Sequence, residues 1–491
     1  MRFLSTRGNC FVNCAAEAIA KGLAEDGGLF VPEFFPKIDI DKLLDMEFYE
    51  RSAYVLSQFL EEYPYDELLK ATKAAYSKFE DSDVAPLVKV DDIFIMELFH
   101  GPTLAFKDVA LTLLPYLLRK GCDISGIKEE VLILVATSGD TGKAALEGFK
   151  DNPGVKIMVL FPSDGVSDMQ KLQMCTQEGK NVNVLAVKGN FDDCQNAVKK
   201  IFSSSKIASE LKERNVVLSS ANSINFGRLA PQIVYYFSAY ADLINSGEIK
   251  PGDKVDFVVP TGNFGNILAG YYAKKMGLPV GKLVCASNSN NVLTEFFLSG
   301  TYDKNRHFYK TSSPSMDILI SSNLERLIFE VSGRNAELTK ERMDELKQTG
   351  KYTVSEKEKK ALSEEFAAGY TDEEECKTEI GEFFEETGYV LDPHTGVAVN
   401  VERNYRDLSG SINKTVVLST ASPYKFPQSV LFAITGHGGK DAFRAADKLY
   451  TETAAPVPEQ ILSLKTKERR FDKVVDKCDV EKEVIAFAEK E

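Results

Sequence analysis

Lys107 stands out because of the residues that surround it. It follows Leu104, Ala105 and Phe106 in the run His100-Gly-Pro-Thr-Leu-Ala-Phe-Lys-Asp108 and opens an apolar stretch. An apolar neighbourhood partly desolvates an ammonium group, which lowers its pKa and prepares the amine for Schiff-base formation with a carbonyl compound. A single lysine at a helix end more often extends its charged tip into solvent, so this reading needs support from elsewhere in the chain.

A second feature is a turn whose composition suits an anion. The apolar run 255–259 leads through Pro260-Thr-Gly-Asn-Phe-Gly-Asn266 into an expected helix over 267–276. A glycine-rich turn before a helix presents free backbone N–H groups, and the helix dipole adds partial positive charge, so it can hold a phosphate without lysine or arginine. An ordinary tight turn has the same composition, and the Gly-x-Gly-x-x-Gly pattern of dinucleotide-binding proteins is absent.

A third feature is the turn Thr137-Ser-Gly-Asp-Thr-Gly142, which follows the apolar run 131–135. Its hydroxyl and N–H groups suit a carboxylate or a phosphate. Gly142-Lys143 resembles part of the phosphate loop of ATPases, but Thr137 replaces the first glycine of that pattern and Ala144 replaces the magnesium-binding hydroxyl. A P-loop ATPase is therefore not expected.

These segments must be positioned by an alternation of strands and helices. Short apolar runs separated by helical stretches predict an α/β fold with two doubly wound, mostly parallel sheets. A helix is expected over 106–118. The expected strands cover residues 92–96, 131–135, 155–161, 183–187, 255–259, 282–286 and 415–419.

The same patterns suggest four regions. We expect a helical N-terminal region over 1–90, an α/β domain that carries Lys107 and the 137–142 turn over 91–240, and a second α/β domain over 241–470 with the 260–266 turn. A charged helical insertion covers about 335–388, with capping boxes at Ser355/Glu358 and Thr371/Glu374. Residues 471–491 read as a C-terminal helix.

Composition excludes several classes of protein. The 491 residues carry a formal net charge of −14 and no concentrated basic patch, which argues against nucleic-acid binding. The apolar runs are too short to span a membrane. The eight cysteines are scattered without a CxxC pair, which favours a reducing compartment, so we expect a cytoplasmic protein with no metal site.

Taken together, the motifs resemble those of threonine synthase, a family of fold-type II pyridoxal-phosphate enzymes related in fold to the tryptophan synthase β chain. The resemblance spans nearly the whole chain and is similar to the bacterial and fungal branch. The run Glu97-Leu-Phe-His-Gly-Pro-Thr-Leu-Ala-Phe-Lys-Asp108 resembles the family's lysine motif. The other matching segments are Lys21 to Pro32, Ala136 to Gly142, Ala221 to Asn225 with Arg228, Pro260 to Asn266, Asp392 to Thr395 and Ser419 to Phe426.

The resemblance implies a role for each candidate residue. Lys107 would hold pyridoxal 5'-phosphate as a Schiff base and move protons at the substrate's α and β carbons. Thr420 would meet the pyridine nitrogen through a neutral hydroxyl, where many pyridoxal enzymes place an aspartate. The turn with Ser138, Asp140 and Thr141 would take the substrate carboxylate. The cofactor phosphate would lie on Gly262, Asn263, Phe264, Gly265 and Asn266.

Arg228 is a candidate for the substrate phosphate, because a guanidinium group matches phosphate oxygens in a bidentate manner. Lys425 is a weaker candidate for the same role. His100 and His394 lie next to prolines or in loops, where a structural role is more common than acid–base catalysis.

The implied reaction converts O-phospho-L-homoserine and water to L-threonine and phosphate, in a monomer or homodimer. One alternative is a pyridoxal-dependent phospholyase of the same fold that deaminates its product to 2-oxobutyrate. Another is a catalytically silent homologue that binds the cofactor or a partner.

Overall fold

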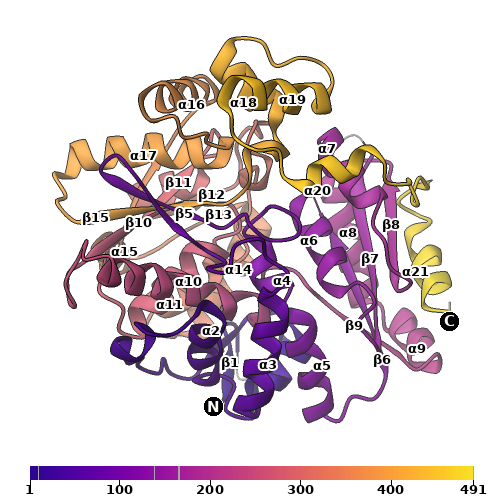
Figure 1. Cartoon of the computed structure of the whole chain (residues 1–491). Helices are drawn as coiled ribbons and strands as arrows, with labels where there is room; N and C mark the ends of the chain where they lie inside the picture. Colours follow the sequence, from indigo (N-terminus) through magenta and orange to yellow (C-terminus); the bar gives the residue numbers. More distant parts are fainter. Residues whose placement is uncertain (9, 138, 164–165, 490–491) are drawn as a thin grey trace.

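Two sheets with helices on both faces organise the chain, which confirms the expected doubly wound α/β architecture. The computed structural model describes residues 1–8, 10–137, 139–163 and 166–489. Figure 1 shows the larger sheet beside the smaller one, with the N-terminal helices below the larger sheet.

The helices are α1 (Ala15–Lys21), α2 (Phe48–Ser57), α3 (Tyr65–Tyr76), α4 (Lys107–Leu111), α5 (Leu114–Ile124), α6 (Asp140–Phe149), α7 (Asp168–Cys175), α8 (Phe191–Ser203), α9 (Ser205–Glu213), α10 (Phe226–Asn245), α11 (Gly265–Lys275), α12 (Val292–Ser299), α13 (Leu324–Val331), α14 (Ala336–Thr349), α15 (Glu356–Glu365), α16 (Glu373–Thr387), α17 (Pro393–Ser409), α18 (Pro427–Thr435), α19 (Ala442–Thr453), α20 (Glu459–Leu462) and α21 (Val480–Ala488). Two small antiparallel sheets join β1 (Phe3–Ser5), β2 (Phe11–Val12) and β3 (Phe30–Pro32), and β12 (Thr301–Asp303) with β13 (Lys351–Thr353).

The larger sheet has the strand order β14-β11-β10-β15-β5-β4, and its neighbours run parallel except for the β4–β5 hairpin. Strand β10, which lies inside the sheet and has the sequence Val-Asp-Phe-Val-Val-Pro, is buried along its whole length. Such a continuous buried run is typical of a parallel strand covered by helices on both faces. The strands are β4 (Leu87–Val90), β5 (Ile93–Glu97), β10 (Val255–Pro260), β11 (Val280–Ser287), β14 (Phe366–Tyr370) and β15 (Lys414–Ser419).

The smaller sheet is entirely parallel, in the order β16-β8-β7-β6-β9. Alternate residues of its central strands serve two cores: Leu134 packs in one core with Val198 of α8, and Ile133 packs in the other with Leu146 of α6. Successive side chains of these strands point to opposite faces of the sheet, so helices pack on both faces. The strands are β6 (Glu130–Ala136), β7 (Val155–Pro162), β8 (Val182–Val187), β9 (Val216–Ser219) and β16 (Val474–Val475).

Three local expectations were wrong. The helix expected over 106–118 is two helices, α4 and α5, and Pro115 lies in the first turn of the second, where its missing N–H is tolerated. The capping box at Ser355/Glu358 is confirmed, but the second box is Asp372/Glu375, because the Asp372 carboxylate accepts the nearby helix N–H groups. The expected C-terminal helix begins only at Val480.

Three of the described strands lie where helices were expected in the insertion and the C-terminal segment, and one of them, β13, falls inside the charged insertion and pairs with β12. β14 falls inside the charged insertion and forms an edge of the larger sheet, and β16 precedes α21 and extends the smaller sheet. β5 precedes Lys107 in the chain yet pairs with β15, so sheet membership does not follow chain order. The domain boundaries at residues 90, 240 and 470 stay a prediction.

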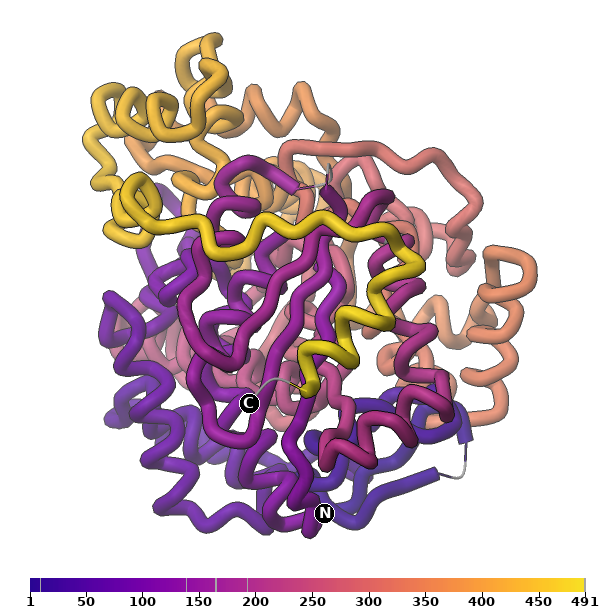
Figure 2. Tube along the Cα trace, turned by 90° about the vertical axis from the view of Figure 1, so that its right-hand side faces the viewer, coloured from indigo at the N-terminus to yellow at the C-terminus, as the bar shows by residue number. Residues whose placement is uncertain are grey.

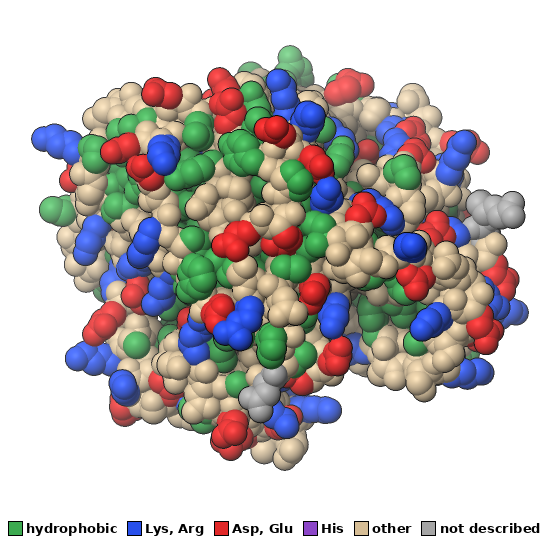
Figure 3. Space-filling view, turned by 90° about the horizontal axis from the view of Figure 1, so that it is seen from below, with side chains coloured by type: hydrophobic (Ala, Val, Ile, Leu, Met, Phe, Trp, Pro, Cys, Tyr) green, Lys and Arg blue, Asp and Glu red, His purple; other side chains and the backbone are tan. Residues whose placement is uncertain are grey.

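The surface mixes charges of both signs. On the face seen from below in Figure 3, acidic and basic side chains alternate with apolar ones, so no field of one sign covers that face. No helix in the described part of the chain has the length and hydropathy that crossing a membrane requires.

Candidate active site

A cavity of about 310 Å³ gathers the residues that the sequence singled out. It lies where β6, β10 and β15 end, since Ala136, Pro260 and Thr420 all line it. The carboxyl ends of parallel strands are the usual position of a ligand site in such folds. The lining includes Lys107, Asp140, Thr141, Arg228, residues 262–266 and Thr420. Ser138 lies outside the described residues.

Lys107 reaches this cavity because its segment is bonded to the strand end that carries Thr420. The N–H of Phe106 donates to the carbonyl of Thr420 at 2.9 Å, and the N–H of Ser422 donates to the carbonyl of Leu104 at 3.1 Å. Asp108 is buried and accepts two hydrogen bonds from Thr103, which close the loop just before α4. The lysine motif is therefore a turn held by hydrogen bonds within the motif and to the segment that carries Thr420.

The Lys107 amine lies in an electrostatic setting that favours its neutral form. Burial lowers the pKa of Lys107 to about 8, and the cations Lys425 and Arg228 act in the same direction. Asp140 opposes them from 3.7 Å, measured from Nζ to its Oδ2. A lysine prepared in this way is a nucleophile near neutral pH.

This pKa predicts how cofactor binding to the cofactor-free protein depends on pH. The association rate constant is expected to rise with pH through about 8 and then level off, because only the neutral amine attacks the cofactor aldehyde. At pH 7 about a tenth of such a lysine is neutral, against about 1 in 3000 for an ordinary one. Stopped-flow absorbance from pH 6 to 10.5 checks this, and a midpoint near 10.5 would contradict it.

Asp140 is held as a carboxylate by several donors. Its Oδ1 accepts from Lys425 at 2.8 Å and Gln170 at 3.0 Å, and its Oδ2 accepts from Ser315 at 3.1 Å. Although burial opposes it, Lys425 and then Lys107 keep the pKa of Asp140 well below its usual range. Lys425 is fully buried in this pair and does not line the cavity, so its contact is structural.

The first turn of α6 offers free donors beside Asp140. The Thr137 hydroxyl accepts the N–H groups of Gly139 and Gly142. Within the described residues, the N–H groups of Asp140 and Thr141 have no hydrogen-bond acceptor. A helix N-terminus with unused donors is suited to a carboxylate or phosphate.

The 262–266 turn also presents backbone N–H groups that have no acceptor among the described residues. Its carbonyls are occupied: Gly262 accepts from Ser321 at 2.7 Å, and Asn263 accepts from the Asn323 amide at 3.0 Å. The N–H groups of residues 262–266 have no acceptor among the described residues, and Phe264 takes φ 59° to start α11. A Cβ added at Gly265 would make ordinary contacts at 3.5 Å or more with Asn323, Ser223 and Gln232, so it would not clash with the protein. The turn therefore fits the phosphate of pyridoxal phosphate.

Gly265 gives a clean test of this cradle. Gly265→Val is expected to weaken cofactor binding by at least about tenfold, because the added side chain would crowd the N–H groups that a phosphate needs, while its Cβ does not clash with the protein. Fluorescence titration of the cofactor-free protein measures it. Loss of the exposed cavity cation in Lys199→Ala should have a smaller effect. Gly262 is no substitute, because its Cβ would lie 2.5 Å from the Ser315 carbonyl. Parental affinity in Gly265→Val would make the turn merely structural.

Ser315 is a site residue that sequence reasoning missed. Its hydroxyl accepts from Lys107 at 3.3 Å and donates to Asp140, and its N–H donates to Nε2 of His394 at 3.2 Å. His394 also bonds Asp392 through Nδ1 at 2.7 Å. His394 thus holds the Ser315 turn in place. The only local signal was a hydroxyl-rich run around Pro314.

Of the remaining candidates, Thr420 and Arg228 line the cavity and His100 does not. The hydroxyl of Thr420 has no hydrogen-bond partner in the described part of the chain, so it is free for a ring nitrogen. Arg228 is buried, donates to the Ala221 carbonyl, and has a buried Nε without a partner. Burial lowers the pKa of Arg228 to about 10. His100 pairs with Glu97 and does not line the cavity.

The fold and this cavity define a pyridoxal-phosphate-dependent enzyme of fold type II, and residues 81–420 match the family model described as pyridoxal-phosphate dependent enzyme. Residues 2–76 match the threonine synthase N terminus, and residues 395–485 match the threonine synthase C-terminal model. The chain belongs to the threonine synthase family, and its cofactor is pyridoxal phosphate.

Known proteins cover the chain at high similarity. The threonine synthase of Pseudomonas aeruginosa is 41% identical over 88% of this chain and 90% of its own. The structure of PLP-bound threonine synthase from Brucella melitensis is 39% identical, covers 100% of both chains and has a TM-score of 0.88. Threonine synthase-like 1 of Macaca fascicularis is 41% identical over 85% of this chain, which spans only 58% of that protein.

Proposed function

We propose that the protein is a threonine synthase, which converts O-phospho-L-homoserine and water to L-threonine and phosphate. The observation that carries this is Arg228, a buried guanidinium in the Lys107 cavity without an acidic partner among the described residues. Buried cations are normally paired. The cofactor phosphate would lie on the 262–266 turn, so a second anionic group would be needed to neutralise Arg228.

The residues around the cavity support a division of labour. The N–H groups of Asp140 and Thr141 and the Thr141 hydroxyl would bind the substrate carboxylate, while the Asp140 side chain stays engaged with Lys425. Ser138 belongs to this proposal through its sequence position alone. Arg228 would bind the substrate phosphate through charge-assisted hydrogen bonds.

Lys107 would carry the protons. Bound pyridoxal phosphate supplies an electron-withdrawing system that acidifies the substrate's Cα–H. Nζ of Lys107 would take one proton from Cα and one from Cβ, and phosphate would leave Cγ. A proton would then be delivered to Cγ, which becomes the methyl group. Water would add its hydroxyl at Cβ and give up a proton, and a proton would return to Cα. Asp140 at 3.7 Å and Ser315 at 3.3 Å would orient the amine for these transfers.

Product analysis tests the proposal. Incubation of the protein with O-phospho-L-homoserine should release L-threonine and inorganic phosphate in equal amounts, measured by chromatography and a phosphate assay. Release of 2-oxobutyrate and ammonia in place of threonine would identify a deaminating phospholyase. Absence of any product from cofactor-loaded protein would identify a silent homologue.

Thr420 predicts a second kinetic signature. Its neutral hydroxyl should leave the pyridine nitrogen largely unprotonated. An unprotonated ring withdraws less of the negative charge that forms on the substrate, so more of that charge can develop at Cβ. Thr420→Asp is expected to retain the cofactor, change its visible spectrum with substrate and slow threonine release. Thr420→Ser should behave like the parent. A parental rate and spectrum in Thr420→Asp would show that Thr420 does not contact the nitrogen.

The assembly and location of the protein are further parts of the proposal. We expect a monomer or a homodimer in the cytoplasm that acts on a small molecule and binds neither nucleic acid nor membrane. Sedimentation velocity of the cofactor-loaded protein distinguishes the two assembly states.

A further inference from the structure

A second cavity, of about 520 Å³, lies against α7 on the smaller sheet. The C-terminal segment borders it at residues 469–474, where that segment crosses the smaller sheet in Figure 2. Residues 440–443, at the start of α19, border it from another side. Its lining includes apolar side chains: Phe161, Leu172, Val184, Phe443 and Phe471. Seven charged side chains share the lining with these apolar ones, and the volume is within the range of small-molecule sites.

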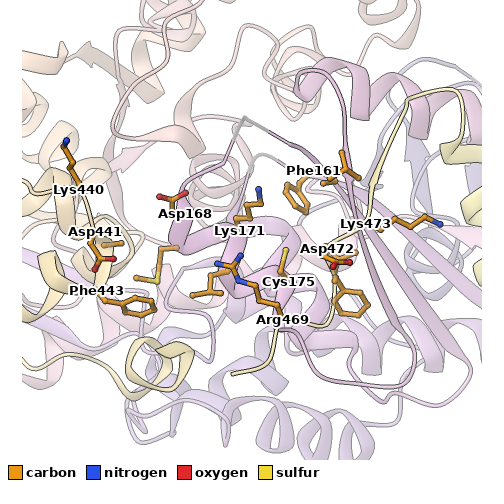
Figure 4. A pocket seen from close by; sticks show the side chains of 17 residues that line it. Phe161, Asp168, Lys171, Cys175, Lys440, Asp441, Phe443, Arg469, Asp472 and Lys473 are labelled. Carbon is orange, nitrogen blue, oxygen red and sulfur yellow. The ribbon is translucent and has the colours of Figure 1, made fainter. Parts of the chain in front are cut away.

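Two segments that border this cavity each present one acid and one base that have no ion-pair partner among the described residues, while Lys473 also lines the cavity but pairs with Glu483. Asp168 and Lys171 lie three residues apart on α7, and Arg469 and Asp472 lie three apart in the C-terminal segment (Figure 4). None of these four side chains forms an ion pair or hydrogen bond with a residue that the structure describes. Opposite charges that share a cavity and remain unpaired match a ligand that carries both signs.

We propose that this cavity binds a zwitterionic α-amino acid with a large apolar side chain, and that binding is transmitted to Asp140 through α7. Lys171 and Arg469 would hold the carboxylate, and Asp168 and Asp472 the ammonium group. The apolar lining would take the side chain. A simple anion would leave Asp168 and Asp472 without a counter-charge.

α7 connects the two cavities. While Lys171 lines the second cavity, Gln170 of the same helix donates to Asp140 at 3.0 Å in the active site. The sulfur of Met174 lies 3.0 Å from the position that a Cβ of Gly142 would occupy. A ligand that shifts α7 therefore moves a donor of Asp140 and a residue packed against the first turn of α6.

Isothermal titration calorimetry of the cofactor-loaded protein tests binding. L-Phenylalanine should bind at a single site per chain. 3-Phenylpropanoate lacks the ammonium group and 2-phenylethylamine lacks the carboxylate, so each should bind at least about tenfold more weakly. Equal affinity for all three, or no binding of L-phenylalanine, would overturn the proposal.

Variants locate the site. Arg469→Gln and Asp472→Asn should each weaken L-phenylalanine binding by about tenfold or more, and Lys467→Gln, an exposed control in the same segment, should not. Parental affinity in both pocket variants would place the ligand elsewhere and refute the site.

Visible circular dichroism of the bound cofactor tests transmission. L-Phenylalanine should change the signal in the parent and leave it unchanged in Arg469→Gln at the same concentration. No change in the parent, or a change that persists in the variant, would refute transmission through α7. Neither readout needs turnover, so failure of the proposed reaction would be seen separately in the product analysis.

Discussion

Lys107→Ala is expected to lower kcat for threonine formation on the order of 10³-fold, while the chain still folds. The variant removes the amine that would move the protons, and Lys199, the other lysine among the described lining residues, is exposed. The fold should survive, because Asp140 keeps its donors from Lys425, Gln170 and Ser315. Steady-state kinetics and thermal unfolding measure the two effects.

A separate experiment tests whether the cofactor is bound covalently to Lys107. After borohydride reduction, peptide mass spectrometry should place the pyridoxyl group on the peptide that contains Lys107. Lys199→Ala is the matched control, since Lys199 lines the same cavity but is exposed, and this variant should keep the adduct. An adduct on Lys199 or Lys425, or turnover at the parental rate in Lys107→Ala, would refute the role of Lys107.

Arg228→Met should change stability and substrate binding in opposite directions. The guanidinium is buried in the first turn of α10, where both desolvation and the helix dipole disfavour a cation. Its removal is expected to raise the free energy of unfolding of the cofactor-free protein by roughly 1–2 kcal/mol. KM for O-phospho-L-homoserine should rise roughly 10- to 100-fold. Denaturant unfolding and initial-rate kinetics measure these effects.

Arg326 is the matched control for this prediction. It is equally buried, but its guanidinium donates to the carbonyls of Phe30 and Ile224 and to Asn323. Arg326→Met should therefore destabilise the protein by about 3 kcal/mol, because buried acceptors lose their donors. If Arg228→Met also destabilises the protein and leaves KM unchanged, Arg228 is a structural residue and the substrate phosphate binds elsewhere.

Much of the site was predictable because its parts are local. Lys107 lies in a run whose residues bond to one another, since the N–H and hydroxyl of Thr103 both donate to the Asp108 carboxylate. The 260–266 turn depends on glycines at fixed offsets between a strand and a helix. Apolar runs of strand length with helices between them are enough to predict parallel sheets. Each of these signals is contained within a few consecutive residues.

The remaining features depend on contacts between distant segments. Ser315 lies far along the chain from Lys107, and nothing near it in sequence reveals that its hydroxyl contacts both Lys107 and Asp140. Lys425 was a weaker candidate for the substrate phosphate, and the fold pairs it instead with Asp140. β14 lies in a charged stretch and becomes a strand only because β11 offers it an unpaired edge. Residue types and short spacings determined which groups can do chemistry. Only packing decided which charges are neutralised and which, like Arg228, remain free, because burial and ion pairing depend on the tertiary structure.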